Sequence, residues 1–535
     1  TRTHSVTAPF KCCVTYALLV LLMASLDQLD STLALFLLFV VSCFFFFVVV
    51  VAKGFGAGRK DGDRTAPPSP PALPVIGNLH QLGSGRYHRT LQALAQSYGP
   101  LFLMHLGSVP TLVVSSASMA EAVLRTQDHD FCSRPQPYTA RGTLYGCRDI
   151  AFSPYGERWR QLRRIAVLHL LSAKRVHSFR ALREQEVASF LDRIREASCI
   201  RRGEGGVNVT ELIVSLTNTV ITRAAFGNKL DGMEPRIVLG MMKEVSDLLG
   251  TIAVSDVFPR LRWVDWATGL DARLNRTAAK LDSILERTLA DHERSRGRID
   301  GEARDLLDDL LTILKDGDQG FKLDRIDVKA LILDMFLAGT DTTYKTIEWT
   351  MAELIKNPRE MEKVQAQVRE VARPHGGVHE EDLGKLSMLH AAIKEALRLH
   401  PPVPLLTPRE TIQDTLLHGY DIQAKTRVMI NAWAIGRDNN SWENAEEFQP
   451  ERFLGSRAID YSGKDHRFIP FGAGRRGCPG IAFGTHLVEL ALANMIYHFD
   501  WKLPDGQDPK SFDVVESGGF SPGLKSALIL AIKIL

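Results

Sequence analysis

An apolar run near the start of the chain is the first clear feature of its hydrophobic pattern. Residues 33–52 read LALFLLFVVSCFFFFVVVVA, twenty consecutive residues without a charge. As an α-helix, such a run is long enough to cross the roughly 30 Å hydrocarbon core of a bilayer. The residues that follow are basic and include Lys53, Arg59, Lys60 and Arg64. Because positive charge marks the cytosolic side, we expect residues 1–66 to form a single-pass anchor, with a transmembrane helix at about 33–52 and a cytosolic body.

Two alternatives stay open in this region. The run could instead be a buried helix or strand, although soluble cores seldom need so long an uninterrupted apolar segment. A second apolar stretch, residues 10–26, carries only Lys11 as a charge. It fits a second crossing, a secretory signal or an extension, and these choices place the N-terminus on different sides of a membrane.

A proline-rich segment separates the apolar run from the rest of the chain. Residues 67–74 read PPSPPALP, with proline at five of eight positions. Proline fixes φ and removes a backbone donor, so we expect a stiff, extended hinge. From Val75 onward, helical periodicity dominates, and short strand-like runs occur at 101–106 and 111–115. The predicted fold is mainly α with minor β, in one catalytic domain at 75–535.

Composition and charge exclude several classes of protein. The 535 residues are 45% hydrophobic and 24% charged, which is ordinary globular usage, and the net charge is only +3. We find no nucleic-acid recognition motif, so no nucleic-acid partner is expected. The seven cysteines form no CxxC pair, which argues against a zinc site or a disulfide framework. For six of them we expect buried thiols in a reducing compartment.

Cys478 stands in a different context. The segment 471–480 reads FGAGRRGCPG and precedes an apolar helical run at 481–496. Backbone N–H groups of a tight loop and of a helix N-terminus stabilise a thiolate, and glycines let a loop approach a flat macrocycle. Arg476 adds a positive charge beside it. A buried thiol in a glycine loop is the plain alternative.

This segment resembles the cytochrome P450 signature FxxGxRxCxG, which is matched at Phe471, Gly474, Arg476, Cys478 and Gly480. The resemblance implies haem b (iron protoporphyrin IX) as cofactor, Cys478 as the axial ligand of its iron, and the cytochrome P450 fold. Segments such as PPVPLLTPRE (401–410) and NAWAIGRD (431–438) are similar to the plant A-type microsomal group.

Further motifs of the family follow in the order that it requires. Glu395 and Arg398 in KEALR match ExxR, and Arg452 lies in PERF. The resemblance implies that these three side chains form a buried charge network beneath the haem. Trp159 and Arg163 match WxxxR, and the resemblance implies that both lie at the cofactor, with the arginine paired with a haem propionate; a surface arginine is the alternative. Arg134 and Arg409 occupy positions where the family commonly places further propionate partners.

A long helix is expected to carry the oxygen chemistry. Residues 327–357 contain no proline and end before Pro358, which allows a helix of roughly 45 Å. Its centre, AGTDTT at 338–343, concentrates residues of poor helix propensity. We interpret the glycine as room for dioxygen and the threonine hydroxyls as groups that loosen the helix. By resemblance, Asp341 relays protons from solvent, Thr342 holds the water that carries them, and Thr343 supports it. A strained structural patch is the alternative.

The resemblance implies a monooxygenase that inserts one oxygen atom from O2 into a small hydrophobic specialised metabolite. No flavin or nicotinamide domain is found, so electrons from NADPH must come through a separate cytochrome P450 reductase, with cytochrome b5 as a second candidate donor. We expect the protein in the endoplasmic reticulum membrane, in contact with lipid. An acidic reductase would dock on a basic region after the first third of the body. Its residues are Arg158, Arg160, Arg163, Arg164, Lys174, Arg175, Arg180 and Arg183. A solvated helix face is the alternative.

The substrate itself stays open among phenylpropanoids, terpenoids, indole derivatives and oximes. Candidate pocket residues, for which plain core is the alternative, are Tyr145, Ile150, Leu337, Ala338, Leu405, Leu406 and Phe520. One rival function is an isomerase or dehydratase of the same family, against which the intact Asp341 and Thr342 argue. The other is a non-catalytic haem sensor or electron carrier, against which the complete oxygen-relay motif argues.

Overall fold

A computed structural model describes residues 65–535 apart from 84, 201–205, 228–234, 296–303, 318–320, 456–458 and 513, together with the single residues 39 and 42. Apart from residues 39 and 42, the transmembrane helix expected at 33–52 therefore lies outside the described residues. Among the helices that are described, none combines the length and the apolar character that crossing a bilayer needs. Arg64–Pro71 and Asn78–Leu535 form one compact unit, and Ala72–Gly77 belong to a second unit with the N-terminal residues.

The proline-rich hinge is extended only in part. Residues 65–72 form no helix or strand, as a proline-rich connector should. Leu73 and Gly77 then exchange two backbone hydrogen bonds of 2.9 and 3.0 Å around Val75, which has a φ of +70°. The chain thus makes a tight turn where the sequence predicted the start of the catalytic domain.

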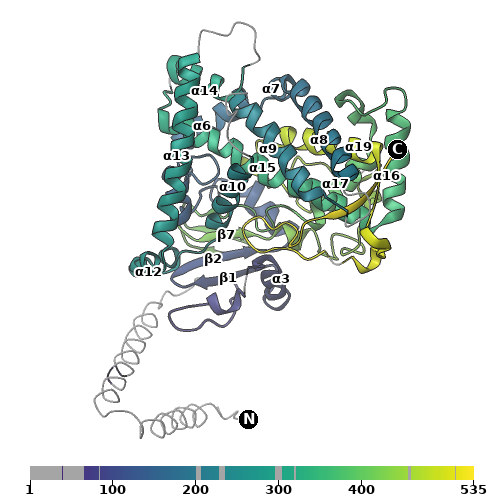
Figure 1. Ribbon diagram of the computed structural model, residues 1–535. Coiled ribbons are helices and arrows are strands. Elements are labelled where there is room, and N and C mark those ends of the chain that lie inside the picture. Colours follow the sequence, from purple (N-terminus) through teal and green to yellow (C-terminus); the bar gives the residue numbers. More distant parts are fainter. Residues whose placement is uncertain are drawn as a thin grey trace, which may run out of the picture. The chain divides into compact units, whose positions relative to one another are not determined.

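Helices dominate the large unit, which confirms the predicted class (Figure 1). They are α3 (Tyr87–Tyr98), α4 (Ala117–Glu121), α5 (Tyr138–Thr143), α6 (Glu157–Ile165), α7 (Ala173–Ser178), α8 (Arg180–Ile200), α9 (Val209–Phe226), α10 (Pro235–Leu249), α11 (Val254–Val257), α12 (Arg262–Ala267), α13 (Leu270–Ser295), α14 (Leu306–Asp316), α15 (Arg325–Lys356), α16 (Pro358–Ala372), α17 (Ser387–Leu399), α18 (Ala432–Ile435) and α19 (Ile481–His498).

The β-structure is minor, and the strands labelled in Figure 1 lie near α3, below α10 and α15 in that view. The strands are β1 (Leu101–Leu106), β2 (Val109–Val114), β3 (Val207–Asn208), β4 (Arg409–Glu410), β5 (Thr415–Leu417), β6 (Tyr420–Ile422), β7 (Arg427–Ile430), β8 (Phe499–Lys502) and β9 (Ile529–Ile534). They form sheets of order β1-β2-β7-β4, β3-β9-β8 and β5-β6. Only β2 and β7 pair in parallel, with Val114 opposite Ile430. Both strand-like runs predicted from the sequence are strands.

α15 forms the centre of the helical body. It has 32 residues and is therefore about 48 Å long. Its N-terminus carries a capping box: the Asp324 carboxylate accepts the Asp327 N–H, and the Asp327 carboxylate accepts the Asp324 N–H. The helix packs against α9, α17 and α19, so most of its residues are buried. This arrangement places the AGTDTT segment in the interior.

The backbone of α15 is continuous through that segment, so the predicted local loosening is wrong. Threonine hydroxyls along the helix do donate to carbonyl oxygens one turn earlier, Thr340 to Phe336 at 2.9 Å and Thr342 to Ala338 at 2.7 Å. These bonds add to the backbone hydrogen bonds of the helix and do not replace them, because each carbonyl oxygen has a second lone pair that can accept the hydroxyl.

Gly339 has a packing role that its sequence context did not reveal. A Cβ at this position would lie 2.7 Å from Cδ1 of Ile221 on α9. The missing side chain therefore lets α9 and α15 approach closely. Gly339 also lines the internal cavity described below, so packing and cavity shape both depend on this residue.

Candidate active site

The loop before α19 holds Cys478 in a fixed turn. The Cys478 N–H donates to the Phe471 carbonyl at 2.9 Å, and the Gly477 N–H donates to the Gly474 carbonyl at 3.0 Å. Gly474 has a φ of +68°, and a Cβ there would lie 2.2 Å from the Leu124 carbonyl oxygen. Only glycine fits such a close approach in this backbone conformation. The loop is thus set rigidly against the helical turn at 122–126.

Cys478 opens into an internal cavity of about 360 Å³. Its side chain has accessible surface, but that surface faces the cavity and protein surrounds the rest of the residue. Burial raises the pKa of the thiol, whereas the Gly480 N–H and the positive charge of Arg163 lower it. The loop therefore offers a single thiol with stabilising donors in place for the anionic form.

Four arginines line the same cavity: Arg134, Arg163, Arg409 and Arg476. Burial lowers the pKa of all four, and the neighbouring positive charges lower it further for Arg134 and for Arg476, whose pKa falls to about 9. Of these four arginines, only Arg409 forms an ion pair within the described part of the chain, with Asp128 at 2.7 Å. The other three donate to backbone carbonyls.

Clustered, buried arginines with so little opposing charge favour an anionic ligand. The donor set fits haem: one thiol suits its iron, and a positively charged wall suits its two carboxylates. The fit rests on the chemistry of these side chains and on their meeting in one cavity.

The expected proton-relay residues lie on α15 and line the same cavity. The Thr342 hydroxyl donates to the Ala338 carbonyl at 2.7 Å, which leaves its oxygen free to accept a further hydrogen bond. Both carboxylate oxygens of Asp341 lie 2.7 Å from Nζ of Lys345. Thr343 is buried beside Gly484 of α19. Thiol, arginines, acid and hydroxyls thus share one cavity.

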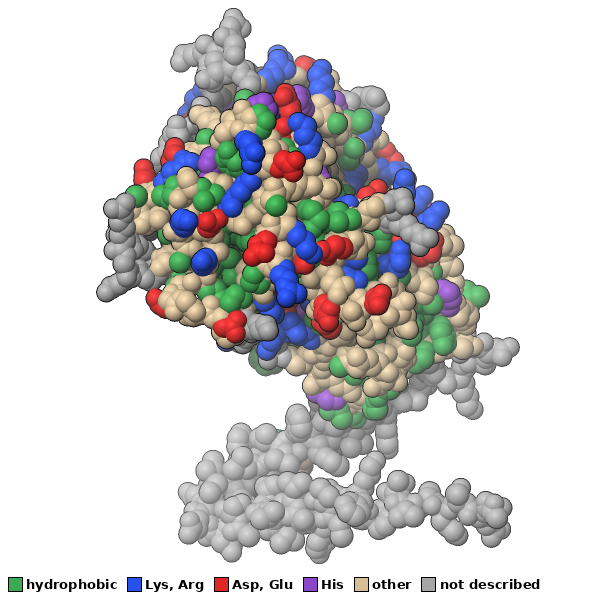
Figure 2. Space-filling model, turned by 90° about the vertical axis from the view of Figure 1, so that its right-hand side faces the viewer, with side chains coloured by type: hydrophobic (Ala, Val, Ile, Leu, Met, Phe, Trp, Pro, Cys, Tyr) green, Lys and Arg blue, Asp and Glu red, His purple; other side chains and the backbone are tan. Residues whose placement is uncertain are grey.

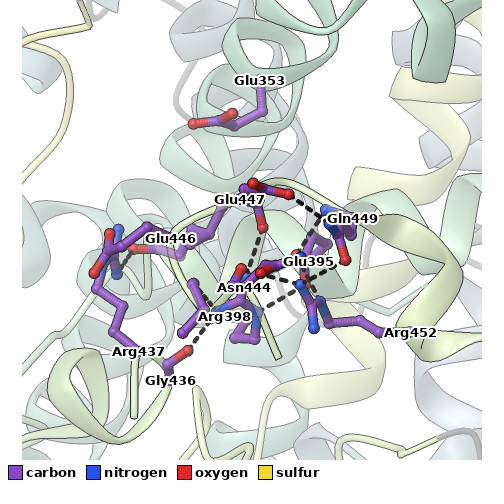
Figure 3. A network of polar contacts seen from close by, with 12 residues as sticks. Glu353, Glu395, Arg398, Gly436, Arg437, Asn444, Glu446, Glu447, Gln449 and Arg452 are labelled. Atoms are coloured by element: carbon purple, nitrogen blue, oxygen red, sulfur yellow. Dashed lines mark hydrogen bonds and ion pairs between the residues drawn. The ribbon is translucent and has the colours of Figure 1, made fainter. Parts of the chain in front are cut away.

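The structure also brings together Glu395, Arg398 and Arg452 (Figure 3). Arg398 donates from Nε and Nη2 to the two oxygens of Glu395, each at 2.7 Å, and neither side chain has exposed surface. Arg452 Nε donates to Glu395 at 3.0 Å, and the Gln449 N–H donates to the same carboxylate oxygen at 2.8 Å. Arg398 also donates to the Ala445 carbonyl at 2.6 Å. This cluster does not line the cavity.

Comparisons with known proteins agree with this geometry. The family model "Cytochrome P450" matches residues 67–523. The chain belongs to the cytochrome P450 family. It is therefore an oxidoreductase that incorporates oxygen, and its family and fold imply haem iron.

Several plant members of this family resemble the chain over most of its length. Cytochrome P450 71A1 of Persea americana is 51% identical over 462 residues, 85% of this chain and 91% of the relative. The phenylacetaldehyde oxime monooxygenase of Prunus mume is 44% identical over 508 residues, 94% and 96% of the two chains. Norfluorocurarine oxidase of a Strychnos species is 46% identical over 465 residues, 85% of this chain and 90% of the relative. These relatives confirm the predicted resemblance to plant A-type cytochromes P450.

A solved structure shows the same fold. A zebrafish cytochrome P450 determined with abiraterone superposes with a TM-score of 0.71 at 26% sequence identity. The match covers 84% of this chain and 99% of the zebrafish chain. The cavity and its walls therefore belong to a known P450 architecture.

Two predicted cofactor residues of this P450 lie behind the cavity wall. Trp159 is buried and does not line the cavity; Arg476 lies over its ring at 3.9 Å from the centroid. Gly474 also does not line the cavity, and it fixes the loop beside Asp128 instead. Both positions support residues that face the cavity. Phe471 and Gly480 do line it, as expected.

Five of the seven residues predicted for the substrate pocket line the cavity. They are Ile150, Leu337, Ala338, Leu406 and Phe520. Tyr145 and Leu405 do not line it. The Tyr145 hydroxyl donates to Asp282 at 2.9 Å, and Leu405 packs with an apolar cluster around β1 and β2. The sequence showed each of them only as an apolar or aromatic position near a motif, which does not separate a cavity wall from ordinary core.

Other apolar lining residues were missed. They include Leu144, Phe152, Ile221, Val245, Leu249 and Leu306. Most of them belong to α9, α10 and α14, where helical periodicity marks a buried face but does not say what that face contacts. Asp128, which pairs with Arg409 and Arg475, was also missed because no local pattern distinguishes it.

A buried pair of acids was not expected either. Asp334 on α15 accepts the Ile150 N–H at 2.6 Å, and Asp149 accepts the Phe152 N–H at 2.8 Å. Burial raises the pKa of Asp149 to about 6. Burial and the neighbouring charge of Asp149 raise the pKa of Asp334 well above its ordinary value. The pair joins α15 to the loop 149–152, which forms part of the cavity wall.

The basic region expected to dock a reductase carries less free charge than its sequence indicates. Carboxylates pair with Arg158, Arg160, Arg175, Arg180 and Arg183. A sixth residue, Arg163, points to the cavity and donates to the Gly477 carbonyl. On the face drawn in Figure 2, basic and acidic side chains are likewise interspersed. Counting arginines in the sequence therefore overstated the unpaired positive charge. Arg160 and Arg180 pair with acids within one helical turn. The acids that pair with the other three come from distant segments.

Proposed function

We propose that this protein is a haem b monooxygenase that inserts one oxygen atom of O2 into a small, mainly apolar specialised metabolite. One observation carries the proposal: a single internal cavity collects the Cys478 thiol, four arginines and the Asp341 and Thr342 side chains. An isomerase or dehydratase has no need of a protonation device at this place. Relatives that are a named monooxygenase and a named oxidase support oxidation of plant metabolites.

When bound, haem supplies the redox chemistry of oxygen activation. Cys478 would bind its iron as a thiolate, which the Gly480 N–H and Arg163 would stabilise. Arg134, Arg163, Arg409 and Arg476 would hold the carboxylates. We expect Trp159 and the cluster of Glu395, Arg398 and Arg452 to keep the surrounding frame rigid.

Proton delivery falls to α15. The Asp341 carboxylate, a quarter exposed, would exchange protons with solvent on one side and with water in the cavity on the other. The Thr342 oxygen would accept a hydrogen bond from that water while its own proton stays on the Ala338 carbonyl. Thr343, which is buried, supports this position and offers a second hydroxyl.

The cavity walls indicate the substrate class. Away from the arginines and the relay residues, aliphatic and aromatic side chains from α9, α10, α14 and the loop before α6 supply most of the lining, with polar groups such as Ser246 among them. Such walls bind small apolar molecules and orient them with few hydrogen bonds. Phenylpropanoid, terpenoid, indole and oxime substrates all fit this description.

Electrons would come from NADPH through a separate cytochrome P450 reductase, with cytochrome b5 as a second donor. We further propose that the protein lies at the endoplasmic reticulum membrane, anchored by residues 33–52. Exposed tryptophans on α12 support contact with lipid, since Trp263 is 64% and Trp266 is 72% exposed beside Arg260 and Arg262. Tryptophan with flanking arginine is typical of surfaces that enter the lipid headgroup region.

The membrane proposal is tested by flotation with liposomes. The full chain should float, a chain without residues 1–66 should float weakly, and the same shortened chain with Trp263→Ser and Trp266→Ser should stay in solution. Equal flotation of both shortened proteins would rule out the α12 contact.

The activity is tested by product analysis with a panel of plant metabolites, NADPH, a cytochrome P450 reductase and isotopically labelled dioxygen. A monooxygenase yields a product that carries one labelled oxygen atom. A rearranged product without label would support the isomerase, and haem binding without any product across the panel would support the sensor. Cys478→Ser serves as the control, since loss of the thiolate ligand should abolish the absorption band of the reduced carbon monoxide complex that thiolate-ligated haem gives.

A further inference from the structure

A buried lysine lies between the proposed relay acid and the loop that carries Phe520. Lys345 stands one turn after Asp341 on α15, and its Nζ is 2.7 Å from each of the two carboxylate oxygens. The Lys345 side chain is only 5% exposed, whereas the Asp341 side chain is 25% exposed. The ammonium group therefore holds both oxygens of a carboxylate that borders the cavity.

The same ammonium group binds the loop 517–523. Nζ of Lys345 donates to the Ser521 carbonyl and lies 3.0 Å from the Ser521 hydroxyl. The loop is closed by Ser517 and Gly523, which exchange hydrogen bonds of 2.8 and 2.9 Å. A Cβ at Gly523 would lie 3.2 Å from Cε of Lys345, so this glycine gives the lysine stem its room. Both Phe520 and Ser521 line the cavity.

An ordinary stabilising ion pair does not account for this arrangement. Exposed pairs of this spacing contribute little to stability, and burying an ammonium group is costly unless all its donors are satisfied. Here the three donors of Lys345 are used by Asp341 and Ser521. The other nearby acid, Glu348, accepts from the Thr210 hydroxyl and the Leu524 N–H instead. Lys345 thus serves the acid and the loop together.

We propose that Lys345 is a positioning residue that orients the Asp341 carboxylate and couples it to the pocket loop through Ser521. The inference rests on the proposed function, in which Asp341 relays protons. A substrate that fills the cavity presses on Phe520, which is adjacent to Ser521 in the chain. The hydrogen bonds that hold Asp341 therefore respond to the presence of substrate, and proton delivery is tied to an occupied pocket.

The test compares Lys345→Met with Lys345→Arg in the full-length haem protein. Methionine keeps the unbranched stem and removes the charge, whereas arginine keeps a cation that can still bind a carboxylate. Lys329→Met is the matched control, because Lys329 is another largely buried lysine of α15 that pairs with acids, Asp282 and Glu286, but does not line the cavity.

Two quantities are measured: hydrogen exchange of the backbone amides of 517–524 in the resting protein, and product formed per NADPH consumed. In Lys345→Met these amides should exchange faster, and the product formed per NADPH should fall on the order of tenfold. Lys345→Arg should keep the exchange rate and the product yield close to those of the wild type, and Lys329→Met should leave both quantities unchanged. Unchanged exchange or an unchanged yield in Lys345→Met overturns the inference.

Asp341→Asn separates this failure from that of the proposed function. If Asp341→Asn keeps its product yield, the relay itself is wrong; if its yield falls while that of Lys345→Met does not, only the role of Lys345 is wrong. Should Lys345→Met fail to incorporate haem, Ser521→Ala replaces it, since it removes one contact of Nζ. Faster exchange and a yield lowered roughly twofold are then expected, and wild-type values of both would overturn the proposal.

Discussion

Arg476 lies over the ring of Trp159, with its guanidinium carbon 3.9 Å from the centre of the indole ring. The Ile150 carbonyl joins the two side chains, because it accepts from Trp159 Nε1 at 3.1 Å and from Arg476 Nη1 at 3.3 Å. Arg476 also donates to the carbonyls of Cys132 and Ser153. A tryptophan outside the cavity thus fixes the orientation of an arginine that lines it.

Trp159 should therefore affect haem retention without contacting haem. Trp159→Ala leaves a cavity and removes the support of Arg476, which we expect to lower the free energy of unfolding by about 3 to 5 kcal/mol and to deplete haem. Trp159→Phe keeps a ring under the guanidinium and loses one hydrogen bond, worth about 1 kcal/mol. The measurements are haem content per protein and urea denaturation. Equal haem loss in both variants would show that the ring face does not matter.

Thr342 should matter for coupling more than for folding. In Thr342→Ala the helix loses only a side-chain bond to the Ala338 carbonyl, and that oxygen keeps its backbone partner, so haem content and substrate affinity should stay near wild type. Hydrogen peroxide released per NADPH should rise, because protons lose their guide. Thr343→Ala is the comparison and should uncouple less, since Thr343 is buried. Equal coupling in all three proteins would remove the role from both hydroxyls.

The acid pair Asp149 and Asp334 should make stability depend on pH. Their pKa values are raised in the folded protein, to about 6 for Asp149. Protonation of this pair therefore stabilises the folded protein. The stabilisation is fully present below the ordinary pKa of aspartate and is lost as the pH rises through about 6. A rise of that size in the pKa of one carboxyl group corresponds to a change in the free energy of unfolding on the order of 3 kcal/mol.

Asp334→Asn keeps an acceptor for the Ile150 N–H and removes one charge. Between pH 5 and pH 8 the variant should lose less free energy of unfolding than wild type, measured by urea denaturation of the haem protein. Asp460→Asn is the control: interactions with Ser462 lower the pKa of Asp460, so it is ionised throughout this range and its removal should leave the slope unchanged. A parallel pH profile for Asp334→Asn and wild type would contradict the prediction.

The sequence predicted what short motifs encode and missed what tertiary contacts create. Cys478, with its glycines, and Glu395 with Arg398 stand in local patterns whose spacing already limits their geometry, and the structure places each set in one cluster. Several partners of the basic region come from segments far away in the chain, such as Glu380 for Arg183 and Asp309 for Arg175, so a local pattern alone could not reveal how much of that charge is balanced.

Residues with two structural roles were the hardest to interpret. Lys345 follows the AGTDTT motif and looks like a solvent-facing residue, because no feature of the local sequence indicates that Ser521 is its partner. Trp159 was expected at the cofactor because it belongs to a motif, but motifs do not distinguish a lining residue from the residue behind it. Gly339 was read as room for dioxygen, whereas its closest steric constraint comes from Ile221 on another helix.

Gly339 and Ile221 should show a measurable coupling energy. Alanine is favoured over glycine in a helix interior by about 1 kcal/mol, but a Cβ at position 339 would lie 2.7 Å from Cδ1 of Ile221, a clash that costs about 1 to 3 kcal/mol. Gly339→Ala alone should therefore be neutral to destabilising. Ile221→Val removes the clashing Cδ1, so in that background Gly339→Ala should raise the free energy of unfolding by about 1 kcal/mol. Urea denaturation of the four proteins in this double-mutant cycle gives the coupling energy. A Gly339→Ala effect that is the same in both backgrounds would show that Ile221 does not restrict position 339, and that the glycine is there for the shape of the cavity alone.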